Sequence, residues 1–397
     1  MTMSSTNPDR PRIAFISVYD SRDVHSFSGT GYYLTEYLQK NWGDVDHLGP
    51  LEEGLNIKMH LLKAKLRSAF LGKRHLADGC YGSRAIAYDH ARQVQKRLRQ
   101  KDYDVIVSPH GIHISLAGLE TDIPIVLYTD ATFASMLNFY PNHSDLLPEV
   151  IREADALEQE ALSTVALAVY SSQWAANSAI DDYNTSREKV KVVPFGANID
   201  NWPSSEEIAQ RKSTAQCHLL FLGVDWQRKG GHIAVETVNE LNRRGLESRL
   251  IVCGCVPPSQ YRNQNIEVVG FLDKHKERDK KRFEQVLLEA SYLIVPSRAD
   301  ATPIVFCEAS AYGLPILTTN VGGIPSVVEN GQNGFTLPVT ADGAEFADVI
   351  EENYTDPTAY HNLCLSAREM YDTVLNWDAS TTAIAEAFNS WNANRRQ

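Results

Sequence analysis

The stretch "YLIVPSRADATPIVFCEASAYGLPILTT" (292–319) decides the fold, because it holds a strand, a helix and a second strand. Its first part, 292–297, is short and apolar and is bounded by turn residues, which is typical of a strand buried on both faces of a parallel sheet. The next apolar part predicts a helix over 304–312 that ends at Gly313, a residue suited to a left-handed C-cap. A further strand follows at 314–319, so the stretch predicts one unit of an α/β protein.

Short apolar runs of the same kind recur along the chain, with longer amphipathic segments between them. They lie at 12–18, 103–109, 123–129, 165–171, 190–196, 218–224, 248–254, 266–271, 292–297 and 314–319. Alternation of strand and helix predicts parallel sheets with right-handed crossovers.

The alternation breaks at about 196–216, where the chain is polar and holds Pro and Ser, so this segment is the best candidate for a linker. We therefore expect two domains of similar size, one over 1–198 and one over 199–377. Both are expected to be Rossmann-like doubly wound sheets that face each other across a cleft. Ligands of such sheets bind beyond the carboxyl ends of the strands.

The composition excludes several other classes of protein. A net charge of −12 over 397 residues argues against general nucleic-acid binding. The six cysteines are scattered, and Cys253 and Cys255, the one close pair, lack partners at zinc-site spacing, so reduced buried thiols are expected. The polar N-terminus has no signal-peptide core and no run is long enough to span a bilayer, which indicates a cytoplasmic protein.

The N-terminal end of the helix at 304–312 has the features of an anion site. Thr302 is a good N-cap and Pro303 fits the first helical position, where its missing N–H costs nothing. The amides of Ile304 and Val305 would then be unpaired at a positive helix end. Asp300 precedes this end and Glu308 lies inside the helix, so both carboxylates could accept hydrogen bonds from sugar hydroxyls. The alternative is a helix with an acidic approach and one structural Glu.

Two further segments point to the same kind of ligand. "FLGVDWQRKGGH" (221–232) places Arg228 and Lys229 on a loop at the carboxyl end of a strand, where two cations can neutralise a diphosphate. Near the N-terminus, Gly29 and Gly31 stand at the mouth of a helix, where glycines allow close approach of a ligand. A third glycine at position 34 would complete the Gly-x-Gly-x-x-Gly fingerprint of dinucleotide-binding proteins. This position is Leu34, so the fingerprint is incomplete.

Taken together, these segments resemble the retaining glycosyltransferases of family four, which have the GT-B fold. The resemblance is strongest over about 217–337 and weaker from residue 12 to the C-terminus. It implies that 1–198, joined by a C-terminal helix at about 378–397, is the acceptor-side domain and that 199–377 is the donor-binding domain. The family signature, an acid, seven residues and a glutamate, then Gly-x-Pro and Gly-Gly, is matched by Asp300, Glu308, Gly313, Pro315, Gly322 and Gly323.

The resemblance implies a role for each matching residue. Glu308 would bind the ribose of a nucleotide sugar, Asp300 the donor sugar, and the amides after Thr302 and Pro303 the diphosphate. Lys229 matches the family lysine that neutralises the departing diphosphate, in a motif that Gly223 opens. Phe271 falls where the nucleobase usually lies, and Gly29 and Gly31 match the glycine loop of the acceptor domain.

The chain departs from the family pattern at three places. Val224 stands where the family has Arg, so Arg228 is expected to supply that charge. The first signature acid is Asp300 and not the commoner Glu. A family histidine that contacts the donor sugar aligns with Asp130; His110 and His113 could compensate, although a structural role is the better expectation for either.

The resemblance implies transfer of a hexose from a nucleoside-diphosphate sugar, UDP favoured over GDP, with retained configuration and no cofactor or metal. The Asp-x-Asp pairs at 44–46 and 102–104 are expected to be chance matches. Alternatives are a nucleotide-sugar epimerase, a phosphorylase, or a catalytically weakened nucleotide-sugar-binding subunit. The basic segment 56–101 could bind an anionic membrane surface and so indicate a lipid-linked acceptor, or could be solvated; a sugar or small-molecule acceptor is the other expectation.

Overall fold

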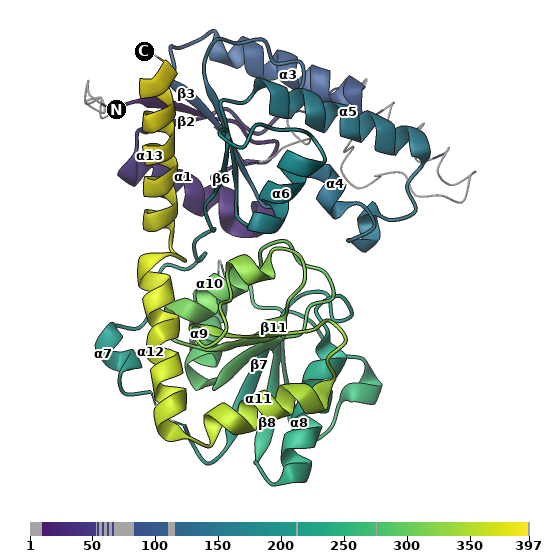
Figure 1. Cartoon of the computed structure of the whole chain (residues 1–397), viewed down its shortest axis with the longest axis vertical. Helices are drawn as coiled ribbons and strands as arrows, with labels where there is room; N and C mark the ends of the chain where they lie inside the picture. Colours follow the sequence, from purple (N-terminus) through teal and green to yellow (C-terminus); the bar gives the residue numbers. More distant parts are fainter. Residues whose placement is uncertain are drawn as a thin grey trace. The chain divides into compact units, whose positions relative to one another are not determined.

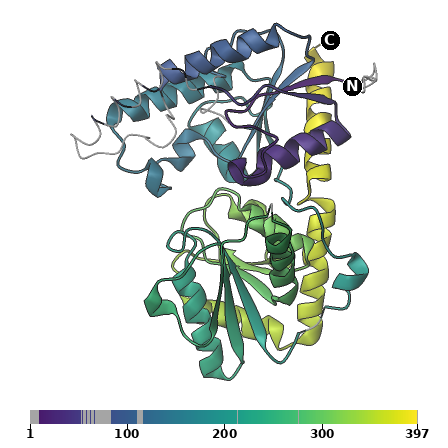
Figure 2. The same cartoon turned by 180° about the vertical axis from the view of Figure 1, so that it is seen from behind.

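The computed structural model describes residues 10–52, 54, 58, 62, 66, 83–109, 116–211, 213–274 and 276–395. The chain divides into two compact units (Figures 1 and 2). Unit 1 comprises residues 1–193 and 380–397, and unit 2 comprises residues 194–379. The sequence predicts these boundaries at 198/199 and 377/378.

Unit 1 is built on a six-stranded parallel sheet in the order β2-β1-β3-β4-β5-β6. Its strands are β1 (Arg12–Phe15), β2 (Asp44–His47), β3 (Val105–Ser108), β4 (Ile125–Thr129), β5 (Leu167–Tyr170) and β6 (Val190–Val192). This is the flavodoxin-like doubly wound order, whose switch point lies between β1 and β3.

Helices connect and cover the strands of unit 1 (Figure 1). They are η1 (Ser26–Gly29), α1 (Thr30–Asn41), α3 (Arg84–Leu98), α4 (Phe133–Met136), η2 (Pro141–His143), α5 (Pro148–Thr164), α6 (Gln173–Asp181) and most of α13 (Trp377–Arg395). The last helix is attached to α1 by two contacts. Asn41 Nδ2 donates to Thr381 Oγ1 at 2.9 Å, and the Trp42 and Phe388 rings lie 5.3 Å apart.

Unit 2 holds a second six-stranded parallel sheet, in the order β12-β11-β10-β7-β8-β9. Its strands are β7 (Cys217–Leu222), β8 (Ser248–Cys253), β9 (Ile266–Gly270), β10 (Tyr292–Val295), β11 (Ile316–Thr319) and β12 (Gly334–Leu337). Its helices are α7 (Ser205–Ile208), α8 (Gly231–Arg244), η3 (Ser259–Tyr261), α9 (Glu277–Glu289), α10 (Ile304–Ala311), η4 (Ile324–Ser326), α11 (Gly343–Tyr354) and α12 (Pro357–Thr373). This is the strand order of dinucleotide-binding domains, with the switch point between β7 and β10.

Alternate residues of the strands β7, β8, β10 and β11 in unit 2 belong to two different cores. Leu220 and Leu222 of β7 pack in a cluster with residues of α9 and α10, whereas Leu219 and Phe221 pack in a cluster with residues of α8 and α11. Side chains of a strand point alternately to the two faces of its sheet, so a strand buried on both faces reads as a continuous apolar run. This explains why the apolar runs mark the strands so clearly.

Every strand predicted from the sequence is present, and the structure adds two edge strands, β2 and β12. β2 has the sequence Asp-Val-Asp-His and is half-buried throughout, so it lacks the apolar run that marks the inner strands. The segment expected to be a linker contains the short helix α7. In the part of the chain that the structure describes, no helix is both long and apolar enough to cross a membrane.

Candidate active site

The candidate site lies at the switch point of unit 2, where β7 and β10 are neighbours in the sheet. The chain leaves the carboxyl end of β7 through the loop 223–230 and that of β10 through the loop 296–303. Because parallel strands end at one edge, these two loops meet there. The amide of Arg298 donates to the carbonyl of Arg228 at 2.7 Å, which joins the loops through their backbones.

Lys229 and Asp300 form the centre of this site. Lys229 Nζ lies 2.5 Å from Asp300 Oδ2, and the Ser297 hydroxyl donates to the same oxygen at 2.8 Å. Both charged side chains are about nine-tenths buried. Removing charges from water is costly unless they are paired, so the pair indicates a carboxylate held in one position by two donors.

Arg228 adds a second cation to Asp300. Its Nη1 lies 3.5 Å from Asp300 Oδ1 and donates to the carbonyl of Ala299 at 2.8 Å. On its other side, Asp225 accepts from the Arg228 backbone amide at 3.1 Å. Arg228 therefore stands beside Lys229, while Val224, which replaces the family arginine, is two-thirds exposed.

Glycines shape the loop that carries the two cations. Gly230 has a φ of 72°, and a Cβ there would meet the Pro296 carbonyl oxygen at 2.0 Å. At Gly223, a Cβ would lie 3.0 Å from Cγ of Lys229. The absence of a side chain at Gly230 thus lets the loop 223–230 pack against the loop 296–303, and its absence at Gly223 leaves room for the Lys229 side chain of the same loop.

The N-cap of helix α10 lies one residue later than predicted. Pro303 is its N-cap, with ψ 116° and no side-chain cap bond, so the predictions of Thr302 as N-cap and Pro303 as the first helical residue are wrong. Thr302 is buried in the loop. Ile304 and Val305 are the first two helical residues, whose amides have no acceptor within a helix, as expected of an anion site.

The other end of α10 is a Schellman motif. Tyr312 is the C-cap, and Gly313 follows with a φ of 55°. The amide of Gly313 donates to the Ser310 carbonyl and that of Leu314 to the Ala309 carbonyl, both at 2.9 Å. The left-handed glycine was predicted, and it ends the helix one residue before the predicted end.

Glu308 is buried within α10, with 1% of its surface exposed. Its Oε1 accepts from Lys274 Nζ at 2.6 Å, whereas Oε2 is buried and has no hydrogen-bond partner among the described residues. Lys274 was not predicted as a site residue, because it stands in the charge-rich run "DKHKERDKK" that is typical of a solvated surface.

Exposed apolar side chains follow the neighbouring strands of the same sheet edge. Phe271 comes directly after β9 and is 69% exposed, and Val224 and Val256 follow β7 and β8. These strands are adjacent in the sheet. Large exposed apolar side chains at the carboxyl edge are suited to contact the flat face of a ring, as expected for a nucleobase.

The candidates of unit 1 lie at the carboxyl edge of its own sheet. Gly29 is the N-cap of α1 with a φ of 83°, so it needs the conformational freedom of glycine. Gly31 is the second residue of α1, and a Cβ there would make ordinary contacts with Ser21 at 3.8 Å. Asp130 follows β4 and is half-buried. His110, His113 and most of the basic segment 56–75 lie outside the described residues.

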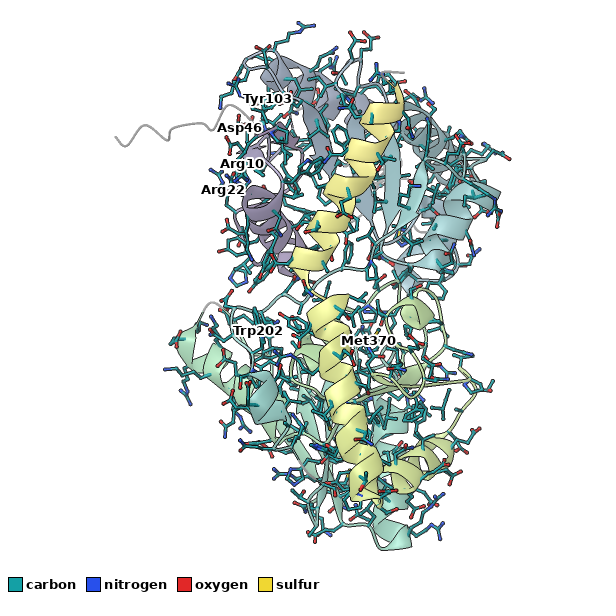
Figure 3. The ribbon with its side chains drawn as sticks, turned by 60° about the vertical axis from the view of Figure 1, so that its left-hand side comes forward. Arg10, Arg22, Asp46, Tyr103, Trp202 and Met370 are labelled. Carbon is teal, nitrogen blue, oxygen red and sulfur yellow. The ribbon has the colours of Figure 1, made fainter. Side chains whose placement is uncertain are left out.

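The Asp-x-Asp pairs have structural partners in unit 1. Asp46 accepts from Lys101 Nζ at 2.7 Å and from the Tyr103 hydroxyl at 3.2 Å, and Figure 3 shows Asp46 and Tyr103 side by side. Burial, together with the Asp46 charge, raises the pKa of Tyr103 to about 12. Asp104 accepts from the backbone amide of Arg12 at 2.7 Å.

The structure thus brings Arg228, Lys229 and Asp300 together and places Ile304, Val305 and Glu308 on the helix that follows. The catalytic and binding roles of all these residues stay predictions. Five cysteines are free thiols among the described residues: Cys217, Cys253, Cys255, Cys307 and Cys364. Burial raises the pKa of Cys253 to about 12, which keeps it a neutral thiol.

The family model described as "Glycosyl transferases group 1" matches residues 216–356, which cover all the candidates of unit 2. Among curated proteins, the chain is 28% identical over 315 residues to the D-inositol 3-phosphate glycosyltransferase of Corynebacterium aurimucosum, covering 74% of this chain and 73% of that protein. It is 26% identical over 218 residues to the glycogen synthase of Mycobacterium tuberculosis, covering 53% of this chain and 50% of that protein. The chain thus spans about half the length of the glycogen synthase that it matches.

Solved structures show the same fold along almost the whole chain. The sucrose-phosphate synthase of Thermosynechococcus elongatus superposes with a TM-score of 0.67 at 15% identity, covering 97% of this chain and 100% of that chain. Anabaena HepE in complex with UDP-glucose superposes with a TM-score of 0.61 at 16% identity, covering 96% of this chain and 100% of that chain. With the two parallel sheets, these neighbours confirm the predicted GT-B fold.

Proposed function

We propose that this chain, whose residues 216–356 match the family model of the group 1 glycosyltransferases, is a retaining hexosyltransferase that uses a nucleoside-diphosphate sugar. The donor is a UDP-sugar in the first instance and a GDP-sugar in the second. The UDP-glucose complex of a protein with the same fold supports this order. The acceptor is a hydroxyl group of a sugar, a small molecule or a lipid-linked compound.

One observation carries the proposal. Two cations, Arg228 and Lys229, share the carboxylate of Asp300 at the switch point of unit 2, directly before the positive end of α10. A diphosphate needs positive charge and amide donors, and a sugar needs a carboxylate acceptor for its hydroxyls. All of these groups stand at one edge of one sheet.

In the proposed reaction, the bond between the anomeric carbon and the diphosphate oxygen breaks, and a bond from that carbon to the acceptor oxygen forms on the same face. The proton of the acceptor hydroxyl passes to the departing phosphate, so no side-chain base is required. Lys229 and Arg228 stabilise the negative charge that develops on the leaving group, together with the α10 amides. Preorganised stabilisation of this kind is often the largest catalytic contribution.

In this scheme Asp300 fixes the Lys229 ammonium and offers its remaining acceptor sites to a donor sugar hydroxyl. Glu308 accepts from the ribose, and Phe271 contacts the base. The cations and amides balance the diphosphate charge without a metal ion. The names of the relatives, a glycogen synthase and a D-inositol 3-phosphate glycosyltransferase, favour a sugar or small-molecule hydroxyl as the acceptor. A lipid-linked acceptor rests on the basic segment 56–101.

The test begins with thermal-shift measurements against UDP-, GDP- and ADP-sugars. The donor that stabilises the protein is then incubated with candidate acceptors and with EDTA, and the anomeric configuration of the product is read by NMR. We expect a product with the configuration of the donor, formed equally well in EDTA. An inverted product, or loss of turnover in EDTA, would contradict the mechanism. Tight nucleotide binding without turnover or donor hydrolysis would favour a binding subunit.

A further inference from the structure

Lys274 and Glu308 form an ion pair that the signature of unit 2 does not contain. Lys274 lies in the turn after β9, and its Nζ is 2.6 Å from Glu308 Oε1 on α10. The two side chains differ in exposure, at 34% for Lys274 and 2% for Glu308. The cation therefore reaches in from the surface to a carboxylate that is enclosed.

A buried carboxylate stays charged only where a cation or several donors stabilise it. Among the described residues, the titratable groups Cys253, Cys307 and Tyr312 also interact electrostatically with Glu308. Burial raises the pKa of each of these three groups, so all are uncharged at neutral pH. Lys274 is thus the cation that the structure records in contact with Glu308 among the described residues.

The Lys274 ammonium is also held by groups other than Glu308. It lies 4.2 Å from the centroid of the Phe283 ring on α9, at the distance of a cation–π contact. It points to the carbonyl of Asn198 at 3.4 Å, and the side chain of the buried Asn198 accepts from Trp377 Nε1 at 2.9 Å. The position of Lys274 is therefore determined by contacts with α9, with α10 and with the backbone at Asn198.

The pairing leaves acceptor capacity on Glu308. A carboxylate has about four lone-pair sites, and Lys274 takes one of them on Oε1. Oε2 is buried and no donor reaches it among the described residues. An unsatisfied buried oxygen is costly, so a hydroxyl donor supplied by a ligand would be favourable there.

We propose that Lys274 is a positioning residue that pairs with the Glu308 carboxylate and orients it to accept a hydrogen bond from the ribose of the donor nucleotide. The inference rests on the proposed function, which places the ribose at Glu308. Lys274 acts through Glu308 and does not touch the reacting atoms. It makes the nucleotide site selective for ribose over sugars that lack the 2′- and 3′-hydroxyls.

The test measures ribose selectivity by titration calorimetry. UDP, GDP and ADP, each with its 2′,3′-dideoxy analogue, are first titrated into the wild type, and the pair that binds most tightly is chosen. This pair is then titrated into Lys274→Gln and Lys274→Arg. A hydrogen bond to a charged group predicts a wild-type preference for ribose of about tenfold or more. Lys274→Gln should reduce it to less than about threefold, and Lys274→Arg should restore it.

The matched control is Lys276→Gln, in the same turn. Lys276 is 70% exposed and pairs with Asp273, so its loss should leave the ribose preference unchanged. The ribose preference is the ratio of the dissociation constants of the two nucleotides for the same protein. A partly unfolded variant loses affinity for both nucleotides by the same factor, so partial unfolding leaves this ratio unchanged. In Glu308→Gln the preference should vanish, and adding Lys274→Gln to it should have no further effect, because the two residues act as one unit.

Three outcomes would overturn the proposal, and they separate it from the proposed function. A wild-type preference that survives in Lys274→Gln would remove the positioning role alone. Nucleotide binding with no ribose preference in the wild type would remove the role of Glu308 and leave nucleotide binding intact. Absence of binding to UDP, GDP and ADP in the wild type would overturn the proposed function as well.

Discussion

Lys229 and Asp300 touch through their side chains although 71 residues separate them in the sequence. Their contact follows from the strand order, because β7 and β10 are neighbours and each residue follows the end of its strand. A single crossover in the topology therefore assembles a cation and an acid that the sequence keeps far apart.

The pair gives the first prediction. Lys229→Met removes the charge next to the departing diphosphate, and we expect kcat/KM to fall about a hundredfold, which corresponds to about 3 kcal/mol of lost transition-state stabilisation. The rate is measured as transfer or, without acceptor, as donor hydrolysis. Lys281→Met is the control, because Lys281 is 71% exposed and pairs with Glu277 on the surface of α9. Wild-type turnover in Lys229→Met would remove this lysine from the mechanism.

The second prediction concerns the glycine after Lys229. Gly230→Ala should destabilise unit 2 by several kcal/mol, because its φ is 72° and its Cβ would meet the Pro296 carbonyl oxygen at 2.0 Å. Gly245→Ala is a matched control: its φ is 96°, but a Cβ there has nothing within 4 Å. It should cost only the backbone strain of about 1–2 kcal/mol. Urea unfolding monitored by tryptophan fluorescence measures the free energy of unfolding of both variants. Equal losses of stability would show that the contact with the Pro296 carbonyl does not contribute to the effect of Gly230→Ala.

The inner strands could be predicted from the sequence because burial on both faces leaves a continuous apolar run. β2 could not, since Asp44 to His47 form a half-buried edge whose polar residues pair with Lys101, Tyr103 and Gln39. The start of α10 was predicted within one residue. Thr302 and Pro303 both suit a helix start, and local preference cannot tell which of the two is the cap.

The signature residues of the site were predicted from the sequence, but Lys274, which contacts one of them, was not. Asp300, Lys229 and Glu308 stand out because each occupies a fixed place relative to a strand or helix end. Lys274 gives no such signal, because it is one of several charged residues that follow β9 in the sequence. Only the packing of α9 against α10 shows that this lysine reaches Glu308 while Lys276 does not.

The third prediction concerns the exposed ring beside β9. Phe271→Ala should weaken nucleotide binding about tenfold or more, because stacking of a base on an aromatic ring contributes about 1–3 kcal/mol. The melting temperature of the free protein should not change, since Phe271 is 69% exposed and its loss opens no cavity. Val268→Ala, at a 38% exposed position of β9, is the control for the strand. An unchanged dissociation constant in Phe271→Ala would place the base elsewhere.

The fourth prediction concerns a carboxyl group buried in unit 1. Glu158 on α5 is 1% exposed, and desolvation, with a small contribution from Asp155, raises its pKa to about 8 against an ordinary value of 4.5. The folded state therefore keeps a proton that the unfolded state releases between these two values. The stabilisation is complete below pH 4.5 and is lost as the pH rises to about 8, at about 1.4 kcal/mol per pH unit.

Glu158→Gln should remove this dependence, because the amide stays neutral while it retains the acceptor for the Phe133 amide. Hydrogen exchange of the β5 amides between pH 5 and 8, corrected for the intrinsic rate, reports the opening free energy of unit 1. We expect the wild type to lose protection with rising pH relative to Glu158→Gln, so that the variant is the more stable protein at pH 8. The exposed Glu386→Gln on α13 should behave as the wild type. Parallel curves of opening free energy against pH for the wild type and Glu158→Gln would mean that Glu158 is charged in the folded protein. Its Oε1 atom, which has no partner among the described residues, would then need a hydrogen-bond donor.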